Sequence, residues 1–200
     1  MSIPKMRFGL VVLVLSLAVA GAVIAAKSGS DRKYSIKKQD EQVVLYTLYR
    51  GSYDQVGADV VELYQLAGQK GISPQGPLTF SYLNNPMLVD PEHWLTEMRI
   101  PVGKDALKQA GKLGEMTDVK VIRPHTVATC KKPPGVGEAE VETLWAGLVK
   151  WTASQGYTTL EGPREVFLSG QETGSYADMK TEFQIPIEKV DLGKGGSGTK

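Results

Sequence analysis

Apolar residues in this chain form one long run near the start and, further along, shorter runs with helix-like or strand-like spacing. From Phe8 to Ala26, 19 consecutive residues carry no charge, and basic residues flank the run on both sides. A helix of that length spans roughly 28 Å, which matches a bilayer hydrocarbon core of about 30 Å. The pattern therefore predicts an N-terminal transmembrane anchor over residues 1–27, followed by a flexible linker over residues 28–34.

A cleavable signal peptide is the alternative interpretation of this apolar run. Ala20-Gly21-Ala22 places small residues where a signal peptidase could cut. The run is longer than the apolar core of most signal peptides, which favours the anchor. More basic residues follow the run than precede it. The positive-inside rule then favours a single-pass membrane protein whose domain lies in the cytoplasm.

The rest of the chain repeats one order of predicted elements, which is strand, helix, strand, strand. In the first copy the patterns fall at residues 43–49, 56–67, 78–83 and 95–102. In the second copy they fall at residues 119–130, with a bend at Pro124, and at 141–149, 165–168 and 180–187. Apolar residues at helical spacing identify each helix, and β-branched or alternating residues identify the strands.

A sequence repeat supports this reading. The segment 96–101 recurs 85 residues later as 181–186, with Thr-Glu and Ile-Pro in both copies, and Gly71 and Gly156 have the same offset. Neither copy could bury its helix stripe and its sheet face alone. We therefore predict an α+β fold in which two β-α-β-β modules share one antiparallel sheet, with a groove at their pseudo-twofold seam.

These patterns also predict the domain boundaries. The domain covers residues 35–190 and is followed by a disordered tail over residues 191–200, which is rich in Gly, Ser and Lys. Within the domain, copy one covers residues 35–102, the connection residues 103–118, and copy two residues 119–190.

Composition and charge argue against several kinds of site. The chain has 23 basic and 22 acidic residues and no basic run interleaved with aromatics, so we expect no nucleic-acid partner. Cys130 is the only cysteine, which rules out a disulfide within the chain and predicts a small buried side chain. His93 and His125 are the only histidines, and neither has a partner at helical metal-ligand spacing. We expect neither a metal nor another cofactor.

Several segments, taken in order, resemble a known family. They cover nearly the whole predicted domain and are residues 49–53, 71–72, 76–77, 85–86, 97–102, 156–157, 162–167 and 182–187. Their order is similar to that of the GyrI-like family, which also forms the effector-binding half of AraC-type and multidrug-sensing transcription regulators. Where those regulators carry a DNA-binding segment, this chain carries the apolar run.

The resemblance implies a duplicated β-α-β-β fold whose groove takes apolar, often cationic aromatic compounds. It also implies a buried glutamate on the last strand as the counter-charge, a position that Glu182 occupies. Alternation along a strand points Glu182 and Phe183 to opposite faces, so Glu182 faces the groove if Phe183 packs under the helices. A carboxylate there could pair with an organic cation, and aromatic walls would add cation-π attraction.

Other candidate ligand-binding residues follow from the same pattern. Glu97 is the repeat mate of Glu182, but Arg99 lies on the same strand face and could neutralise it, so a structural role is equally open. The aromatic candidates for the groove walls lie in or next to predicted strands and helices, and are Tyr53, Tyr82, Trp94, Trp145 and Phe167. Trp145 belongs to an apolar helix stripe, a position more typical of a core residue.

The predicted function is that of a membrane-anchored domain that binds small lipophilic, cationic aromatic molecules in a groove between two repeats. One alternative is a hydrolase of reactive cytotoxic compounds that uses Glu182 as its catalytic group. Another is a membrane adaptor that recruits a protein partner, which the sequence does not identify, and whose groove is filled by its own side chains. The sequence has no nucleophile with a base beside it, so binding is favoured and no catalytic residue is assigned.

Overall fold

The computed structural model of this protein describes residues 34–85 and 88–190. The predicted anchor over residues 1–27, the linker up to residue 33 and the tail over residues 191–200 lie outside the described residues. Among the helices of residues 34–85 and 88–190, none is long and apolar enough to cross a membrane. Tyr34, the last residue of the predicted linker, stacks on Trp151 with ring centroids 5.5 Å apart.

Within the described residues, two α-helices and one nine-stranded antiparallel sheet confirm the predicted α+β class. The helices are α1 (Val56–Gln69) and α2 (Glu138–Ser154). The strands are β1 (Ser35–Gln39), β2 (Gln42–Arg50), β3 (Thr79–Tyr82), β4 (Leu95–Val102), β5 (Thr117–Ile122), β6 (His125–Lys132), β7 (Tyr157–Thr159), β8 (Arg164–Ser169) and β9 (Lys180–Lys189). Short 3-10 turns are η1 (Pro91–His93), η2 (Lys104–Gln109), η3 (Gln171–Thr173) and η4 (Tyr176–Asp178).

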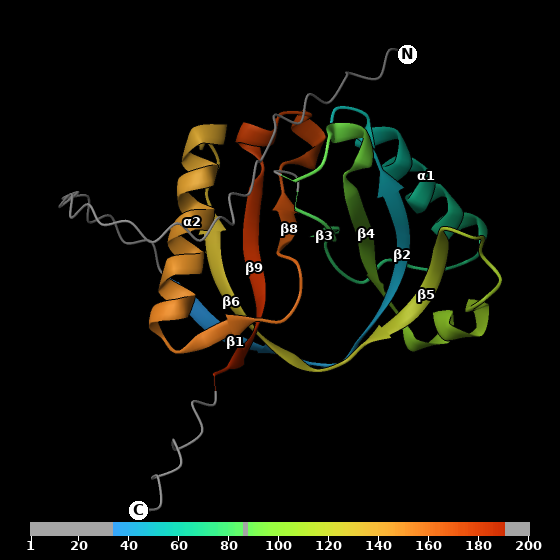
Figure 1. Ribbon diagram of the computed structural model, residues 1–200. Coiled ribbons are helices and arrows are strands. Elements are labelled where there is room, and N and C mark those ends of the chain that lie inside the picture. The colour runs from blue at the N-terminus through green and yellow to red at the C-terminus, as the bar shows by residue number, and fades with distance from the viewer. Residues whose placement is uncertain (1–33, 86–87, 191–200) are drawn as a thin grey trace, which may run out of the picture.

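The order of the strands is symmetric about the centre of the sheet. It runs β1-β6-β9-β8-β3-β4-β2-β5, with β7 beside β9. At the centre β3 pairs with β8, and Phe80 lies opposite Glu165, which is 85 residues further along the chain. A pseudo-twofold axis therefore passes through this pair. Figure 1 shows the sheet curling between α2, which lies beside β6, and α1, which lies beside β2.

The two faces of the sheet differ in character. On one face Phe183 of β9 stacks on Trp145 of α2, with ring centroids 4.3 Å apart. Paired residues on neighbouring strands share a face, so the row Cys130, Phe183, Glu165, Phe80 and Met98 lies on this helix-covered face. Most of its side chains are buried and apolar and form the core, including Cys130 as expected. We call the opposite face the helix-free face.

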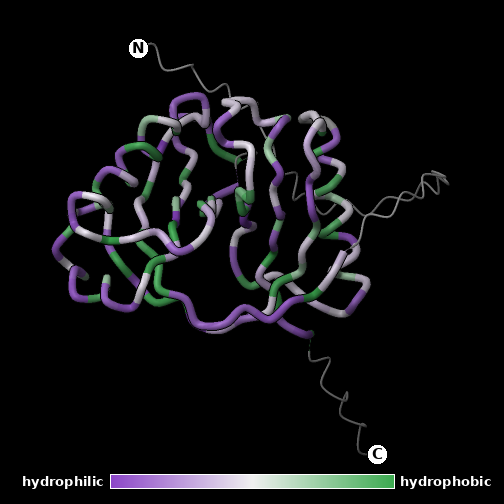
Figure 2. The backbone as a smooth tube through the Cα atoms, turned by 180° about the vertical axis from the view of Figure 1, so that it is seen from behind, coloured by the Kyte–Doolittle hydropathy of each residue, from purple (hydrophilic) through white to green (hydrophobic). Residues whose placement is uncertain are grey.

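The two copies exchange their edge strands. β1 belongs to the first copy but pairs with β6 of the second, whereas β5, which begins at the end of the connection and continues into the second copy, pairs with β2 of the first. Only two residues separate β1 from β2, and Arg123-Pro124 separate β5 from β6. Each pair is thus one long bent strand that spans both halves. The bent strands pass beside each other at the lower edge in Figure 1, and Figure 2 shows that this part of the backbone is hydrophilic.

The exchanged strands also form two reciprocal ion pairs on the helix-free face. Lys37 Nζ of β1 donates to Glu182 Oε2 at 2.6 Å, and Lys120 Nζ of β5 donates to Glu97 Oε2 at 2.6 Å. Two residues after each glutamate, a further donor completes the arrangement. Gln184 donates to Glu182 at 2.9 Å, and Arg99 donates to Glu97. Each ion pair therefore joins one copy to the other.

Replacing Lys37 with methionine should destabilise the domain, because it leaves the buried carboxylate of Glu182 without its cation. Lys37 itself is half-exposed, so solvent screens the pair, and we expect a loss of about 1–2 kcal/mol in the free energy of unfolding, measured by urea denaturation. The double variant Lys37→Met/Glu182→Gln should recover part of this loss, since no charge is then left unpaired. Lys38→Met, on the other face of β1, is the matched control. Equal losses in the Lys37 and Lys38 variants would contradict the prediction.

Candidate functional site

Four side chains from β3 and β8 meet at the seam on the helix-covered face. They are Phe80 and Tyr82 from β3 and Glu165 and Phe167 from β8, each two positions from its neighbour on the same strand. Phe80 and Glu165 face each other at the axis, and Tyr82 and Phe167, also 85 residues apart, flank them. The rings of Phe80 and Phe167 meet edge to face at 4.8 Å. The symmetry thus places the carboxylate of Glu165 at the position that the phenyl ring of Phe80 occupies in the first copy.

The carboxylate of Glu165 is enclosed by tyrosine hydroxyls. Its residue is only 1% exposed. Tyr176 Oη donates to Oε1 at 2.6 Å and Tyr82 Oη donates to Oε2 at 3.0 Å. Burial raises the pKa of Glu165, while the tyrosine hydroxyls and the charge of Lys132 oppose that rise. The site therefore holds a carboxyl group that is costly to ionise unless a cation lies beside it.

The predicted aromatic residues are linked to Glu165 directly or through neighbouring rings. Tyr53, just before α1, contacts Tyr82 at 5.7 Å and Trp94 at 4.8 Å between ring centroids. Burial raises the pKa of Tyr53 to about 12, so its hydroxyl stays protonated, near Thr96 Oγ1 at 3.4 Å. Trp145 reaches the site from the other side through Phe183, the strand partner of Glu165. Its buried indole N–H has no acceptor in the part of the chain that the structure describes.

An apolar groove opens beside this cluster. It has a volume of about 560 Å³ and lies between α1 and the end of β8. Its lining residues are mostly apolar and are Val60, Tyr64, Pro77, Leu78, Phe167, Leu168 and Gln171. Phe167 belongs to both the groove and the seam, so it connects the open groove with the ring of Phe80 and, beyond it, with Glu165.

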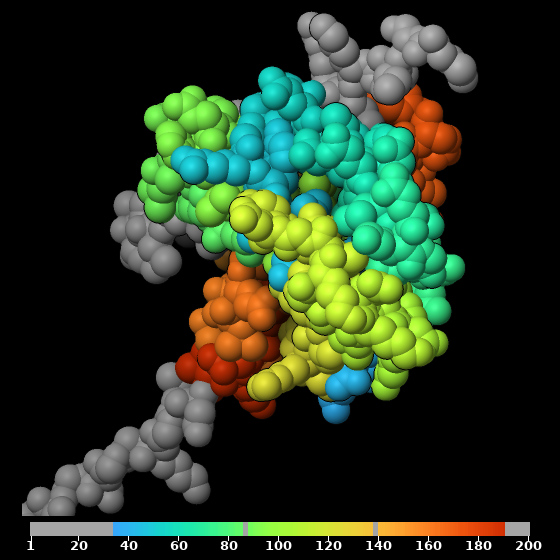
Figure 3. Space-filling model, turned by 90° about the vertical axis from the view of Figure 1, so that its right-hand side faces the viewer, coloured from blue at the N-terminus to red at the C-terminus, as the bar shows by residue number. Residues whose placement is uncertain are grey.

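A smaller and more polar hollow of about 340 Å³ lies elsewhere, where the end of α1 meets η2. Lys70, Gln75, Asp105 and Lys108 are among its lining residues. Figure 3 looks onto this side of the molecule and shows α1 next to the segment that contains η2 and β5. None of the predicted site residues lines this hollow, and we give it no role.

Glu182 and Glu97 lie apart from the aromatic residues. Alternation does point Glu182 and Phe183 to opposite faces, but the face with the aromatic cluster is that of Phe183. Glu182 is 7% exposed on the helix-free face, where Lys37 already supplies a cation. Glu97 has Arg99 and Lys120 in the same way. The geometry therefore favours Glu165 as the carboxylate of the site, and a ligand role for Glu182 stays a prediction.

Glu165 was not among the residues that sequence reasoning selected, although a signal for it was present. It lies two positions before Phe167, on the same face of the same strand, and inside the segment 162–167 that carries the family resemblance. The sequence alone did not show which face of this strand the helices cover. Gly162 belongs to the same segment and is required sterically, because a Cβ there would lie 1.9 Å from the carbonyl oxygen of Tyr82.

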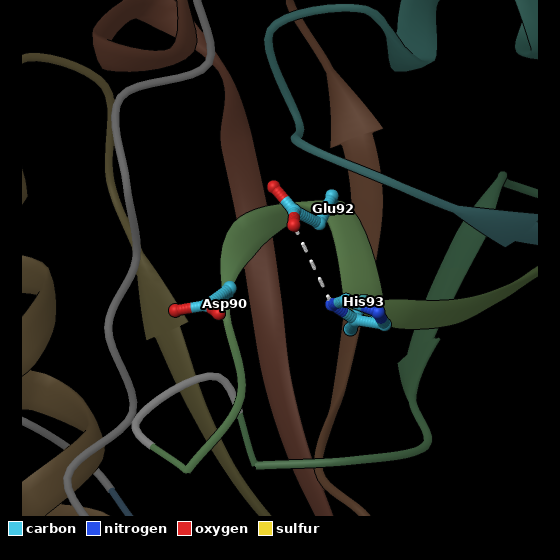
Figure 4. A group of neighbouring side chains, drawn as sticks. All are labelled: Asp90, Glu92 and His93. Carbon is cyan, nitrogen blue, oxygen red and sulfur yellow. Dashed lines mark ion pairs between the residues drawn. The ribbon is translucent and has the colours of Figure 1, made fainter.

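One cluster of possible metal ligands lies on the surface at η1. Asp90, Glu92 and His93 have ligand atoms within 4.8 Å of one another, and all three residues are exposed. Figure 4 shows the imidazole facing Glu92, with His93 Nδ1 4.0 Å from the carboxylate, while Asp90 lies on the other side of the turn. Exposed acidic groups are common without a metal, and we assign no metal site here.

Comparisons with known proteins agree with this fold. Residues 32–188 match the GyrI-like small molecule binding domain. No functionally curated protein sequence matches the chain. The C-terminal domain of EcmrR has a similar structure, with 19% identity, a TM-score of 0.58, and coverage of 80% of this chain and 99% of that domain. In the EcmrR–DNA complex the similarity spans only 58% of the EcmrR chain, with 79% coverage of this chain, 19% identity and a TM-score of 0.60.

A protein from Listeria innocua described as a hydrolase is similar as well. It has 14% identity and a TM-score of 0.58, with coverage of 78% of this chain and 92% of that one. At identities this low, similarity to a solved structure shows a shared fold, and the activity named for each of these proteins is stated of that protein alone.

Glu165→Gln should change how the stability of the domain depends on pH. A raised pKa in the folded state contributes stability below the ordinary value of 4.5, and this contribution is lost as the pH rises through the folded pKa. The free energy of unfolding of the wild type, minus that of Glu165→Gln, should therefore fall as the pH rises above 4.5. Urea denaturation at a series of pH values measures this difference, in which other titrating groups cancel. A difference that rises with pH would contradict the assignment.

Proposed function

This chain belongs to the GyrI-like family of small-molecule-binding domains, and we propose that it binds lipophilic, cationic aromatic molecules at the seam between its two copies. The observation that carries the proposal is the buried carboxylate of Glu165, held among aromatic rings next to an apolar groove of about 560 Å³. That volume falls within the range of about 300–1,000 Å³ typical of small-molecule sites.

The chemistry of the seam suits an organic cation. A carboxyl group in an apolar site gains most from a cation that brings little bound water, and a delocalised aromatic cation has this property. The faces of Tyr53, Tyr82 and Trp94 would add cation-π attraction of roughly 0.5–2 kcal/mol each. Glu182 and Glu97 have lysine partners of their own, so they have less need of a ligand cation.

Glu165→Gln should weaken binding of a cationic ligand far more than binding of a neutral one. N-methylacridinium and acridine at pH 8 form a suitable pair, because they share one ring system and differ in charge. Loss of a desolvated charge partner lowers affinity by roughly thirtyfold or more. Calorimetric titration of the full-length protein with each compound measures the effect.

Glu182→Gln is the matched control, since it removes the same charge from the opposite face of the sheet. It should leave the affinity for both compounds within about threefold of the wild type. Equal losses for the cation and the neutral compound in Glu165→Gln would remove the counter-charge role. A selective loss in Glu182→Gln would instead return that role to the residue expected from the sequence.

The hydrolase alternative rests on the same carboxyl group. A glutamate whose pKa is raised, with two tyrosine hydroxyls in contact, has the properties of a general acid or base. In that case a reactive lipophilic compound would be turned over by the wild type and by Glu182→Gln but not by Glu165→Gln. Binding of acridines without turnover of such compounds would leave the binding function alone.

A membrane tether is the remaining part of the proposal, and its support is the sequence. The 19 uncharged residues from Phe8 to Ala26 suit a spanning helix, and the basic residues that follow them favour a cytoplasmic domain. The full-length protein should therefore remain in the membrane fraction after an alkaline carbonate wash, and external protease should leave its domain intact in whole cells. A mature protein that begins near residue 23 would show that the run is a signal peptide.

A further inference from the structure

Lys132 is a charged group inside the core that the proposed binding does not use. It lies on β6 on the helix-covered face, and its side chain is fully buried. Its Nζ donates to the carbonyl oxygens of Tyr176 at 2.9 Å, Ala177 at 3.4 Å and Met179 at 2.7 Å. The ammonium also lies 4.6 Å from the centroid of the Tyr176 ring. All three of its protons are thus directed at one short segment.

That segment is the loop of residues 170–179, which joins β8 to β9. Gly170 and Gly174 have φ values of +91° and +68°, and a Cβ on Gly170 would lie 2.8 Å from the carbonyl oxygen of Asp178. Glycine thus allows the loop to close on itself. Gln171 of the loop lines the apolar groove, while Tyr176 donates to Glu165. The loop therefore contacts the open groove at one point and the buried carboxylate at another.

The first copy has no equivalent of this arrangement. Lys132 pairs with Thr181 on β9, and the corresponding position opposite Thr96 on β4 is Tyr49. The residue 85 positions before Tyr176 is Pro91, which has no hydroxyl. The lysine and the tyrosine hydroxyl thus occur only in the copy that supplies Glu165.

Charge links Lys132 with the carboxylate. The ammonium lowers the pKa of Glu165, and Glu165 in turn counteracts the lowering of the Lys132 pKa by burial. With Tyr176 on Oε1 and Tyr82 on Oε2, both carboxylate oxygens are engaged. An organic cation that reaches Glu165 therefore competes with the tyrosine hydroxyls for the carboxylate, and it also repels the ammonium that holds the loop.

We propose that Lys132 determines the charge specificity of the seam site. Its ammonium is the resident cation that competes with a ligand cation for Glu165, and it holds the 170–179 loop closed over that carboxylate. A cationic ligand then binds only when this loop opens. The proposal rests on the proposed function and identifies the residue that limits the affinity for cations.

Lys132→Met keeps the length of the side chain and removes its charge and its hydrogen bonds to the loop. In the full-length variant, the dissociation constant of N-methylacridinium should fall by about tenfold or more, since the competing cation is gone. Acridine, which carries no charge at pH 8, should change by less than about threefold. Without ligand, backbone amides of residues 176–180 should exchange with deuterium faster than in the wild type.

Lys131→Met is the control, because Lys131 is exposed and points to the opposite face of β6. Tyr176→Phe is a second variant that leaves Lys132 in place and frees Oε1, and it should also tighten cation binding. Weaker cation binding in both variants, or equal changes for the two acridines, would overturn the proposal, as would unchanged amide exchange in Lys132→Met. If neither the wild type nor any variant bound either compound, both the proposed function and the competition between Lys132 and a ligand cation would be wrong. Faster amide exchange in Lys132→Met would then support only the role of Lys132 in holding the 170–179 loop closed.

Discussion

The pairing of β3 with β8 joins the two copies, and the chemistry of the site follows from it. A duplicated backbone brings equivalent positions face to face at its axis, which here are occupied by Phe80 and Glu165. The backbone is close to symmetric at this point, but the side chains are not. One carboxyl group is therefore buried in a layer that is otherwise apolar, and the surrounding groups compensate it. Tyr82 comes from one side, Tyr176 from the other, and Lys132 adds a charge of opposite sign.

The two faces of the sheet carry their polar groups in different environments. On the helix-free face, charges are paired across the repeats, so Lys37 with Glu182 and Lys120 with Glu97 contribute to cohesion. On the helix-covered face, the polar groups of the seam are few and lie within an aromatic layer. A carboxylate that already has a lysine at 2.6 Å has little to gain from a ligand, whereas one that is raised in pKa by burial has much to gain. Position relative to the helices thus separates the two ion-paired glutamates, Glu97 and Glu182, from Glu165.

The sequence predicted the elements well and their partners less well. The strands at 43–49 and 95–102, and the helix from Val56, were recognisable because their apolar spacing and the 85-residue repeat are local features. The exchange of β1 and β5 was not predicted, because alternation along a strand does not say which neighbour it pairs with. β7 is only three residues long and gave no pattern of its own. Among the predicted site residues, Tyr53 contacts Tyr82 and Trp94, and a ligand role for the five aromatics stays a prediction. Glu165 was not selected because the helix-covered face could not be identified from one strand alone.

The exchanged strands have a mechanical consequence. Because β1-β2 and β5-β6 each run through both halves, the backbone crosses between the halves twice, each time as part of a continuous bent strand. A ligand that entered the seam could not separate the two halves as rigid bodies, because β1 would have to leave the sheet of the second half or β5 that of the first. In the proposed binding, room for a ligand would come from segments that do not cross between the halves, such as η1 before β4 and the 170–179 loop before β9. The two strand crossings thus hold the halves of the sheet together, and the segments that can move without breaking a strand pair lie at the edge of the sheet.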